Sequence, residues 1–94
     1  MKIEYSEHIK NRIILRKIDH KLPKIIIEQS EEKYLDTETG HLIAVMDVNL
    51  YDKKREVMVA YTFHKDHVTL LTIHPLKEGQ KEKRIITGRW RKIQ

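Results

Sequence analysis

The spacing of apolar residues changes once along this chain, and that change is the feature that most limits its fold. Before about residue 30 the apolar side chains recur every three or four positions, whereas from Lys33 onward they recur every second position. A period near 3.6 is typical of a helix with one buried face, and a period of two is typical of a half-buried strand. The chain is therefore predicted to be an α+β protein, with helices first and a sheet after them.

Two helices are predicted in the first third of the chain. Ser6 is a favourable N-cap for a first helix over residues 7–18. The apolar stripe of this helix consists of Ile9, Ile13, Ile14 and Ile18. Pro23 opens a second helix that continues to Glu28, although the three consecutive isoleucines inside it also fit a strand. Residues 2–5 alternate and fit a short first strand or an extended arm.

Four strands are predicted over residues 33–36, 41–51, 55–63 and 68–73, with turn-forming residues between them. One face of the second strand is apolar through Leu42, Ala44, Met46, Val48 and Leu50. His41, Asp47 and Asn49 place a wetter face on the other side. Pro75 ends the last strand, and residues 78–87 fit a last short helix that Gly88 stops. The expected architecture is two N-terminal helices packed on a curved four-stranded antiparallel sheet, with a short C-terminal helix and a basic tail.

Length and composition exclude several classes of protein. A chain of 94 residues fits a single domain over residues 1–94, and about 60–65% of its unfolded surface can be buried. That favours a surface groove over a deep cofactor cavity, so no cofactor is expected. The absence of cysteine excludes disulfides and thiolate chemistry, and the six histidines show no spacing for a metal site. The polar first dozen residues and the lack of a long apolar run predict a cytoplasmic protein without a membrane partner.

The charge balance points to an anionic partner. Lys and Arg number 19 against 14 Asp and Glu, which gives a formal net charge of +5. Such an excess favours contact with nucleic-acid phosphates. An acidic protein partner and a merely solvated basic face remain alternatives.

Two groups of residues are candidates for chemistry on RNA. His8, Arg12 and Arg16 are four positions apart, so they share a helix face away from the isoleucine stripe. Metal-free RNA cleavage needs a base, an acid and cations around the phosphate. We predict catalytic roles for His8, Arg12, His74 and Arg84. We predict RNA contacts for Arg16, Gln80, Arg89, Trp90 and Arg91, although a Trp near a terminus also fits a core position, and the first-helix group also fits a solvated face.

Two motifs carry a family resemblance that spans nearly the whole chain. They are Tyr5-Ser6-x-His8-x3-Arg12-x3-Arg16 and His74-Pro75-x4-Gln80-x3-Arg84-Ile85-x2-Gly88-Arg89-Trp90. Together they resemble the small toxin-like domains related to BrnT and the wider RelE superfamily. The resemblance implies a sheet curled against two N-terminal helices, and a metal-independent endoribonuclease that a partner antitoxin silences. The family-style roles would fall on His8, Arg12, Arg16, His74, Arg84 and Arg89.

The predicted function is therefore a toxin-like, metal-independent endoribonuclease of a toxin–antitoxin system, which binds RNA through a basic groove. The predicted partners are RNA and an antitoxin protein. Two alternatives stay open, a non-catalytic module that binds RNA or DNA and a basic interaction domain that docks an acidic protein.

Overall fold

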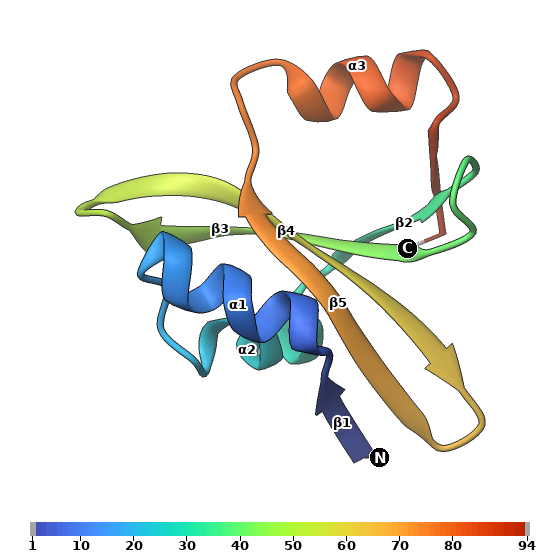
Figure 1. Ribbon diagram of the computed structural model, residues 1–94. Coiled ribbons are helices and arrows are strands. Elements are labelled where there is room, and N and C mark those ends of the chain that lie inside the picture. Colours follow the sequence, from blue (N-terminus) through green and yellow to red (C-terminus); the bar gives the residue numbers. More distant parts are fainter. Residues whose placement is uncertain (1, 94) are drawn as a thin grey trace.

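One sheet runs through the whole molecule, and its strands come from both ends of the chain (Figure 1). The computed structural model describes residues 2–93. In chain order the elements are β1 (Lys2–Tyr5), α1 (Glu7–Arg16), α2 (Leu22–Gln29), β2 (Glu32–Asp36), β3 (Leu42–Leu50), β4 (Lys53–His64), β5 (His67–Pro75), α3 (Gln80–Ile86) and β6 (Trp90–Lys92). The order of strands across the sheet is β1-β5-β4-β3-β2-β6.

The prediction of a four-stranded antiparallel sheet is wrong, because the described residues form a six-stranded mixed sheet. β1 pairs with β5 in parallel, and β6 pairs with β2 in antiparallel orientation. Most of the predicted basic tail, residues 89–92, is thus the edge strand β6. Residues 2–5 do form the short first strand that their alternation predicts. The pairings of β1 with β5 and of β6 with β2 could not be predicted, because each joins segments more than 50 residues apart in the chain.

The two early helices form where the sequence predicts them, with different ends. Ser6 caps α1, since its Oγ accepts a hydrogen bond from the backbone N–H of Ile9 at 3.1 Å. The helix ends at Arg16, before the predicted end at Ile18, because Lys17 takes a left-handed conformation with φ of 53°. Ile18 is nevertheless buried with Ile9 and Ile13. The prediction that Ile14 belongs to the same stripe is wrong, because its side chain is 75% exposed on another face of α1. The three isoleucines after Pro23 lie in helix α2, so the strand alternative is wrong.

The helices α1 and α2 cover one side of the sheet, as predicted. Ile9, Ile13 and Ile26 pack there against residues of β3, β4 and β5, including Ala44, Val57, Val59 and Leu70. The opposite side of the sheet, which was predicted to be a wetter face, is partly apolar. Apolar residues of β2, β3 and β4 form a second core cluster there with the single tryptophan, made of Tyr34, Ile43, Val45, Met58, Ala60 and Trp90.

α3 arches over this second side of the sheet (Figure 1) and has no buried residue of its own. It is held to the sheet by polar contacts. The Lys81 ammonium lies 2.8 Å from a carboxylate oxygen of Glu32 on β2 and 2.7 Å from one of Glu56 on β4. Burial opposes the charge of Lys81, but the hydrogen bonds and negative charges of the two glutamates raise its pKa above the usual value. These two ion pairs of Lys81 therefore hold α3 to strands β2 and β4.

Candidate nucleic-acid interface

The polar face of α1 runs along an open edge of β5. β1 pairs with β5 only as far as Tyr5, which lies opposite Leu70. Beyond that point the chain enters α1, which packs on the first side of the sheet and contacts β5 at both of its ends. The Ser6 hydroxyl donates to the carbonyl of Leu71 at 3.1 Å, and the Arg16 guanidinium donates to the carbonyl of Ile73 at 3.5 Å. The column of His8, Arg12 and Arg16 therefore follows the strand that leads to His74.

His74 is half-buried on the side of the sheet that α3 covers. It lies opposite Met58 in the register, and its Nδ1 is 3.3 Å from the carbonyl oxygen of Pro75. Burial is the main cause that lowers the pKa of His74, and the positive charges of Arg16, Arg84 and Arg12 lower it further against the opposing effect of the Pro75 carbonyl. The imidazole is therefore neutral near pH 7, which is the form that accepts a proton.

We use the name cationic groove for a group of four residues, Arg12 and Arg16 on α1, His74 on β5 and Arg84 on α3. His74 and Arg84 line one cavity, and the charges of Arg12 and Arg16 act on the same histidine. In residues 2–93 none of the three arginines has a carboxylate at ion-pair distance. The guanidinium of Arg84 lies over the Trp90 ring, 5.5 Å from its centroid, which holds the charge toward the sheet. Arginines without a counter-ion, around a neutral histidine, suit the binding of an anion such as a phosphate.

His8 lies at the far end of the same column and is exposed. Its Nε2 accepts a hydrogen bond from the Arg12 Nε at 3.3 Å. Helix geometry places His8 roughly 12 Å along α1 from Arg16, with Arg12 between them. The structure therefore links His8 to the cationic groove through its hydrogen bond with Arg12. Of this column, Arg16 and Arg12 act on His74 through their charges, which lower its pKa.

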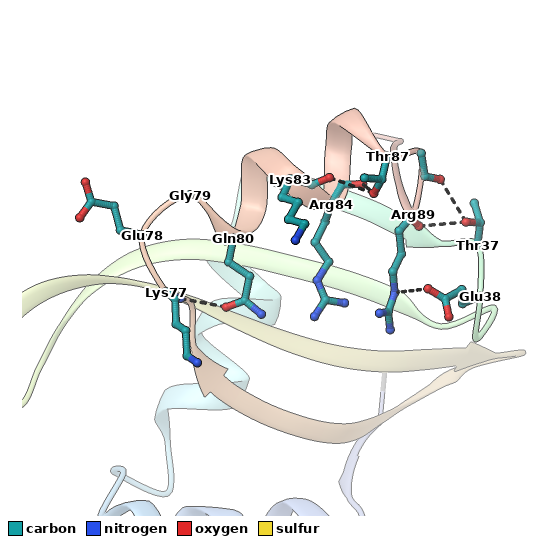
Figure 2. Close-up of a pocket in the computed structure, with 11 residues that line it drawn as sticks. Thr37, Glu38, Lys77, Glu78, Gly79, Gln80, Lys83, Arg84, Thr87 and Arg89 are labelled. Carbon is teal, nitrogen blue, oxygen red and sulfur yellow. Dashed lines mark hydrogen bonds and ion pairs between the residues drawn. The ribbon is translucent and has the colours of Figure 1, made fainter.

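Two hollows meet beneath α3 and share Arg84 and Arg89. The larger is an open groove of about 720 Å³, and its lining includes Lys77 and Gln80. Figure 2 shows the side chains of Arg84 and Arg89 reaching from α3 and the segment after it toward the sheet. The smaller hollow, of about 200 Å³, is lined by His74 together with the same two arginines. His74 and Arg84, which are ten residues apart in the chain, thus meet in one cavity as their predicted roles require.

Arg89 is engaged in a structural role. Its guanidinium pairs with Asp36 at 3.3 Å and with Glu38 at 3.1 Å, which fastens the segment after α3 to the β2–β3 loop. Burial alone would raise the pKa of Asp36, but the hydrogen bonds from Arg89 and from the backbone N–H groups of Glu38 and Thr39 lower it. The charge of Arg89 is therefore compensated, unlike that of Arg84.

Trp90 is part of the core, so the core alternative fits the structure and stacking on a base does not. Its side chain is only 2% exposed and stacks on Tyr34, with ring centroids 5.6 Å apart. Arg84 lies over the same ring. No ring face is left for a nucleobase in this arrangement.

Gln80 and Arg91 lie outside the cationic groove. The Gln80 Oε1 accepts a hydrogen bond from the backbone N–H of Lys77 at 2.9 Å, so it fixes the turn before α3. Arg91 follows Trp90 on β6, and neighbouring residues of a strand point to opposite faces. Arg91 is therefore exposed on the side away from the second core cluster.

Sequence reasoning missed the polar residues His41 and Thr72, which line the same small cavity as His74. The alternation of β3 and β5 carries a signal for both, because His41 precedes the cluster residue Ile43 by two positions and Thr72 precedes His74 by two. Lys81 was also missed, since its glutamate partners are distant in the sequence.

Comparison with protein-family models, curated proteins and solved structures finds no match to this chain. Within residues 2–93 no helix has the length and apolar character needed to span a bilayer. The same residues contain no group of three His, Cys, Asp or Glu side chains placed to hold a metal ion.

The Arg89 contacts predict a loss of stability in Arg89→Ala. Asp36 is 4% exposed and would lose its charged partner, so the free energy of unfolding should fall by about 2–3 kcal/mol. Because the folded pKa of Asp36 is lowered, its contribution is present above the unfolded pKa and is lost as the pH falls below about 4. Urea unfolding at pH 7 and at pH 3 measures the free energy of unfolding of the variant and of wild type. The difference between the two proteins should be smaller at pH 3 than at pH 7.

Arg91→Ala is the matched control, because Arg91 is exposed and makes no ion pair in the described residues. Its unfolding free energy should change by less than about 0.5 kcal/mol. Equal stabilities of the two variants would show that the Arg89–Asp36 contact does not support the fold.

Proposed function

We propose that this chain is a toxin-like, metal-independent endoribonuclease that acts in the cytoplasm and holds an RNA phosphate in the cationic groove. The observation that carries the proposal is the cavity that His74 shares with Arg84, an arginine without a carboxylate partner in residues 2–93. The positive charges of Arg12 and Arg16 act on the same histidine. The resemblance of both motifs to RelE-superfamily and BrnT-related domains supports the same activity.

The proposed chemistry is attack of a ribose 2′-hydroxyl on the neighbouring phosphorus. Neutral His74 takes the hydroxyl proton as the O2′–P bond forms, and the P–O5′ bond then breaks. Arg84 and Arg12 stabilise the extra negative charge on the phosphate oxygens in the transition state. His8, in its protonated form, gives a proton to the leaving 5′ oxygen, which requires its Nε2 to release the hydrogen bond that it accepts from Arg12. The products are a 2′,3′-cyclic phosphate and a 5′-hydroxyl.

The proposed protein partner is an antitoxin that docks beside the cationic groove. Ile14 and Leu15 on α1 are 75% and 72% exposed, which is unusual for residues of this size. Basic residues of the same helix adjoin them, so an acidic amphipathic segment would match this surface.

The deciding experiment is incubation of a labelled single-stranded RNA with the purified protein in EDTA. Cleavage to products with a cyclic phosphate supports the enzyme. Binding without cleavage supports the non-catalytic RNA- or DNA-binding module in its place. Failure of RNA, DNA and heparin to bind at low salt contradicts both, and leaves an interaction domain or a solvated basic surface.

RNA affinity is expected to fall steeply with salt and to depend on α1. With about three or four phosphate contacts, the slope of log K against log salt should be about −2 to −3 for single strands. Combined Arg12→Ala and Arg16→Ala changes should reduce the slope by about 1 to 2 without changing the melting temperature. Fluorescence anisotropy over a salt series measures this. The control with the same loss of charge is Lys24→Ala with Lys65→Ala, two exposed positions on α2 and the β4–β5 turn, and it should leave the slope nearly unchanged.

A further inference from the structure

The small cavity at His74 is larger than a phosphate needs and continues away from the cationic groove. It crosses the second side of the sheet from His74 on β5 to the β2–β3 loop, where Thr39 and His41 line it. Arg84 and Arg89 close it from the α3 side. The part of the cavity beyond Arg84 takes no part in the proposed cleavage.

The lining of this part suits a flat molecule with polar edges. Its floor consists of Ile43, Met58 and Ala60, which are between 2% and 5% exposed. Its rim carries the imidazole of His41 and the hydroxyl of Thr72. In residues 2–93 neither of these two groups forms a hydrogen bond with another side chain or with the backbone. The carboxylate of Asp36, which lies at the same rim, already accepts hydrogen bonds from Arg89 and from the backbone N–H groups of Glu38 and Thr39. An apolar floor and free polar groups at the rim are typical of a small-molecule subsite.

The size of the cavity limits its occupant to one nucleoside. Its volume of about 200 Å³ corresponds to about six or seven water molecules. That room fits one base with part of its ribose and excludes two stacked bases. The open groove of about 720 Å³ shares Arg84 and Arg89 with the cavity, so the flanking RNA backbone has a path beneath α3.

We propose that the cavity is a nucleoside subsite, in which one unstacked base lies on Ile43, Met58 and Ala60 while its phosphate contacts Arg84 and His74. This inference rests on the proposed function. His41 and Thr72 hydrogen-bond to the edge of the base and set the base preference. The substrate class is then single-stranded RNA, because a paired and stacked base cannot enter such a cavity.

The test compares small probes by NMR on protein with labelled histidine rings. Inorganic phosphate and ribose phosphate should shift the signals of His74 and leave those of His41 in place. The four nucleoside 3′-monophosphates should shift both rings, and the best of them should bind about tenfold more tightly than ribose phosphate because the base face is buried. Nucleotides that bind no better than ribose phosphate, or that leave His41 unmoved, would overturn the subsite.

Variants of the rim separate base recognition from phosphate binding. His41→Ala and Thr72→Val should each narrow the spread of affinities among the four nucleotides, and should leave the affinity for inorganic phosphate within about twofold. His64→Ala, in the exposed end of β4, is the control. If His41→Ala fails to fold, Thr72→Val, which keeps the side-chain shape, still decides. If the spread of affinities among the four nucleotides is unchanged in both Thr72→Val and His41→Ala, these two side chains do not recognise the base.

The two proposals fail in different ways in these measurements. If inorganic phosphate and every nucleotide leave His74 unchanged, the phosphate site itself is absent and the proposed function falls with the subsite. If inorganic phosphate shifts the His74 signals but the base adds no affinity, the nucleoside subsite is rejected and the phosphate site stands.

Discussion

Replacement of His74 by alanine is expected to slow RNA cleavage by a factor of about 10²–10⁴, which is the usual contribution of a general base. RNA affinity should change by less than about threefold, since Arg12, Arg16 and Arg84 supply the phosphate contacts and stay in place. Single-turnover cleavage in EDTA measures the rate, and anisotropy measures the affinity. The expected pattern is a fall in the rate of the chemical step with nearly unchanged binding.

The pH profile of the same reaction tests the state of His74. Because burial and the three arginines lower its pKa, the acidic limb of the rate profile should lie below pH 6.5, where the base becomes protonated. Removal of a neighbouring positive charge in Arg84→Ala raises the pKa of His74, so the acidic limb of its profile should move to higher pH. A cleavage rate unchanged in His74→Ala would contradict the assignment, while His64→Ala should match wild type.

Replacement of Trp90 by alanine is expected to lower the free energy of unfolding by about 3–5 kcal/mol, out of a total of about 5–15 for a domain of this size. The side chain fills the second core cluster and supports both Tyr34 and Arg84. Its indole Nε1 is buried and has no hydrogen-bond acceptor among residues 2–93. Trp90→Phe keeps most of the ring and removes this unpaired donor, so we expect a much smaller loss, of about 1 kcal/mol.

Urea unfolding and RNA binding together distinguish a core role for Trp90 from a base-stacking role. A core role predicts a large loss of stability in Trp90→Ala, with Trp90→Phe close to wild type in both measurements. If Trp90→Ala keeps the wild-type stability but loses RNA affinity, the ring contacts the RNA directly and the packing against Tyr34 is not needed for the fold.

Local patterns were sufficient for the elements that have enough residues to show a period. The isoleucine stripe places Ile9 and Ile13 in the core, and the alternation of β3 and β4 places Ala44, Val57 and Val59 on the same side. The spacing of four between His8, Arg12 and Arg16 likewise predicts one helix face. These are consequences of backbone geometry within a single element, and the tertiary structure agrees with them.

The residues that were predicted to act on RNA divide differently. Sequence reasoning gave Arg84 a catalytic role and gave both Arg89 and Arg91 RNA contacts, because charge alone does not reveal a counter-ion. Only the pairing of β6 with β2 brings Arg89 to Asp36 and turns Arg91 to the far side. The alternation around Trp90 is too short to show that the ring is buried.

The sequence by itself determined the two early helices, the four central strands and the residue types that suit an RNA phosphate. Only the tertiary structure decided that β1 and β6 complete a six-stranded sheet, that the second side of the sheet has its own core, and that α3 closes a cavity beside His74. The physical reason is that helix and strand periods arise between residues close in the chain. The pairing of short strands, the neutralisation of Arg89 and the lowered pKa of His74 depend on contacts between segments that are dozens of residues apart.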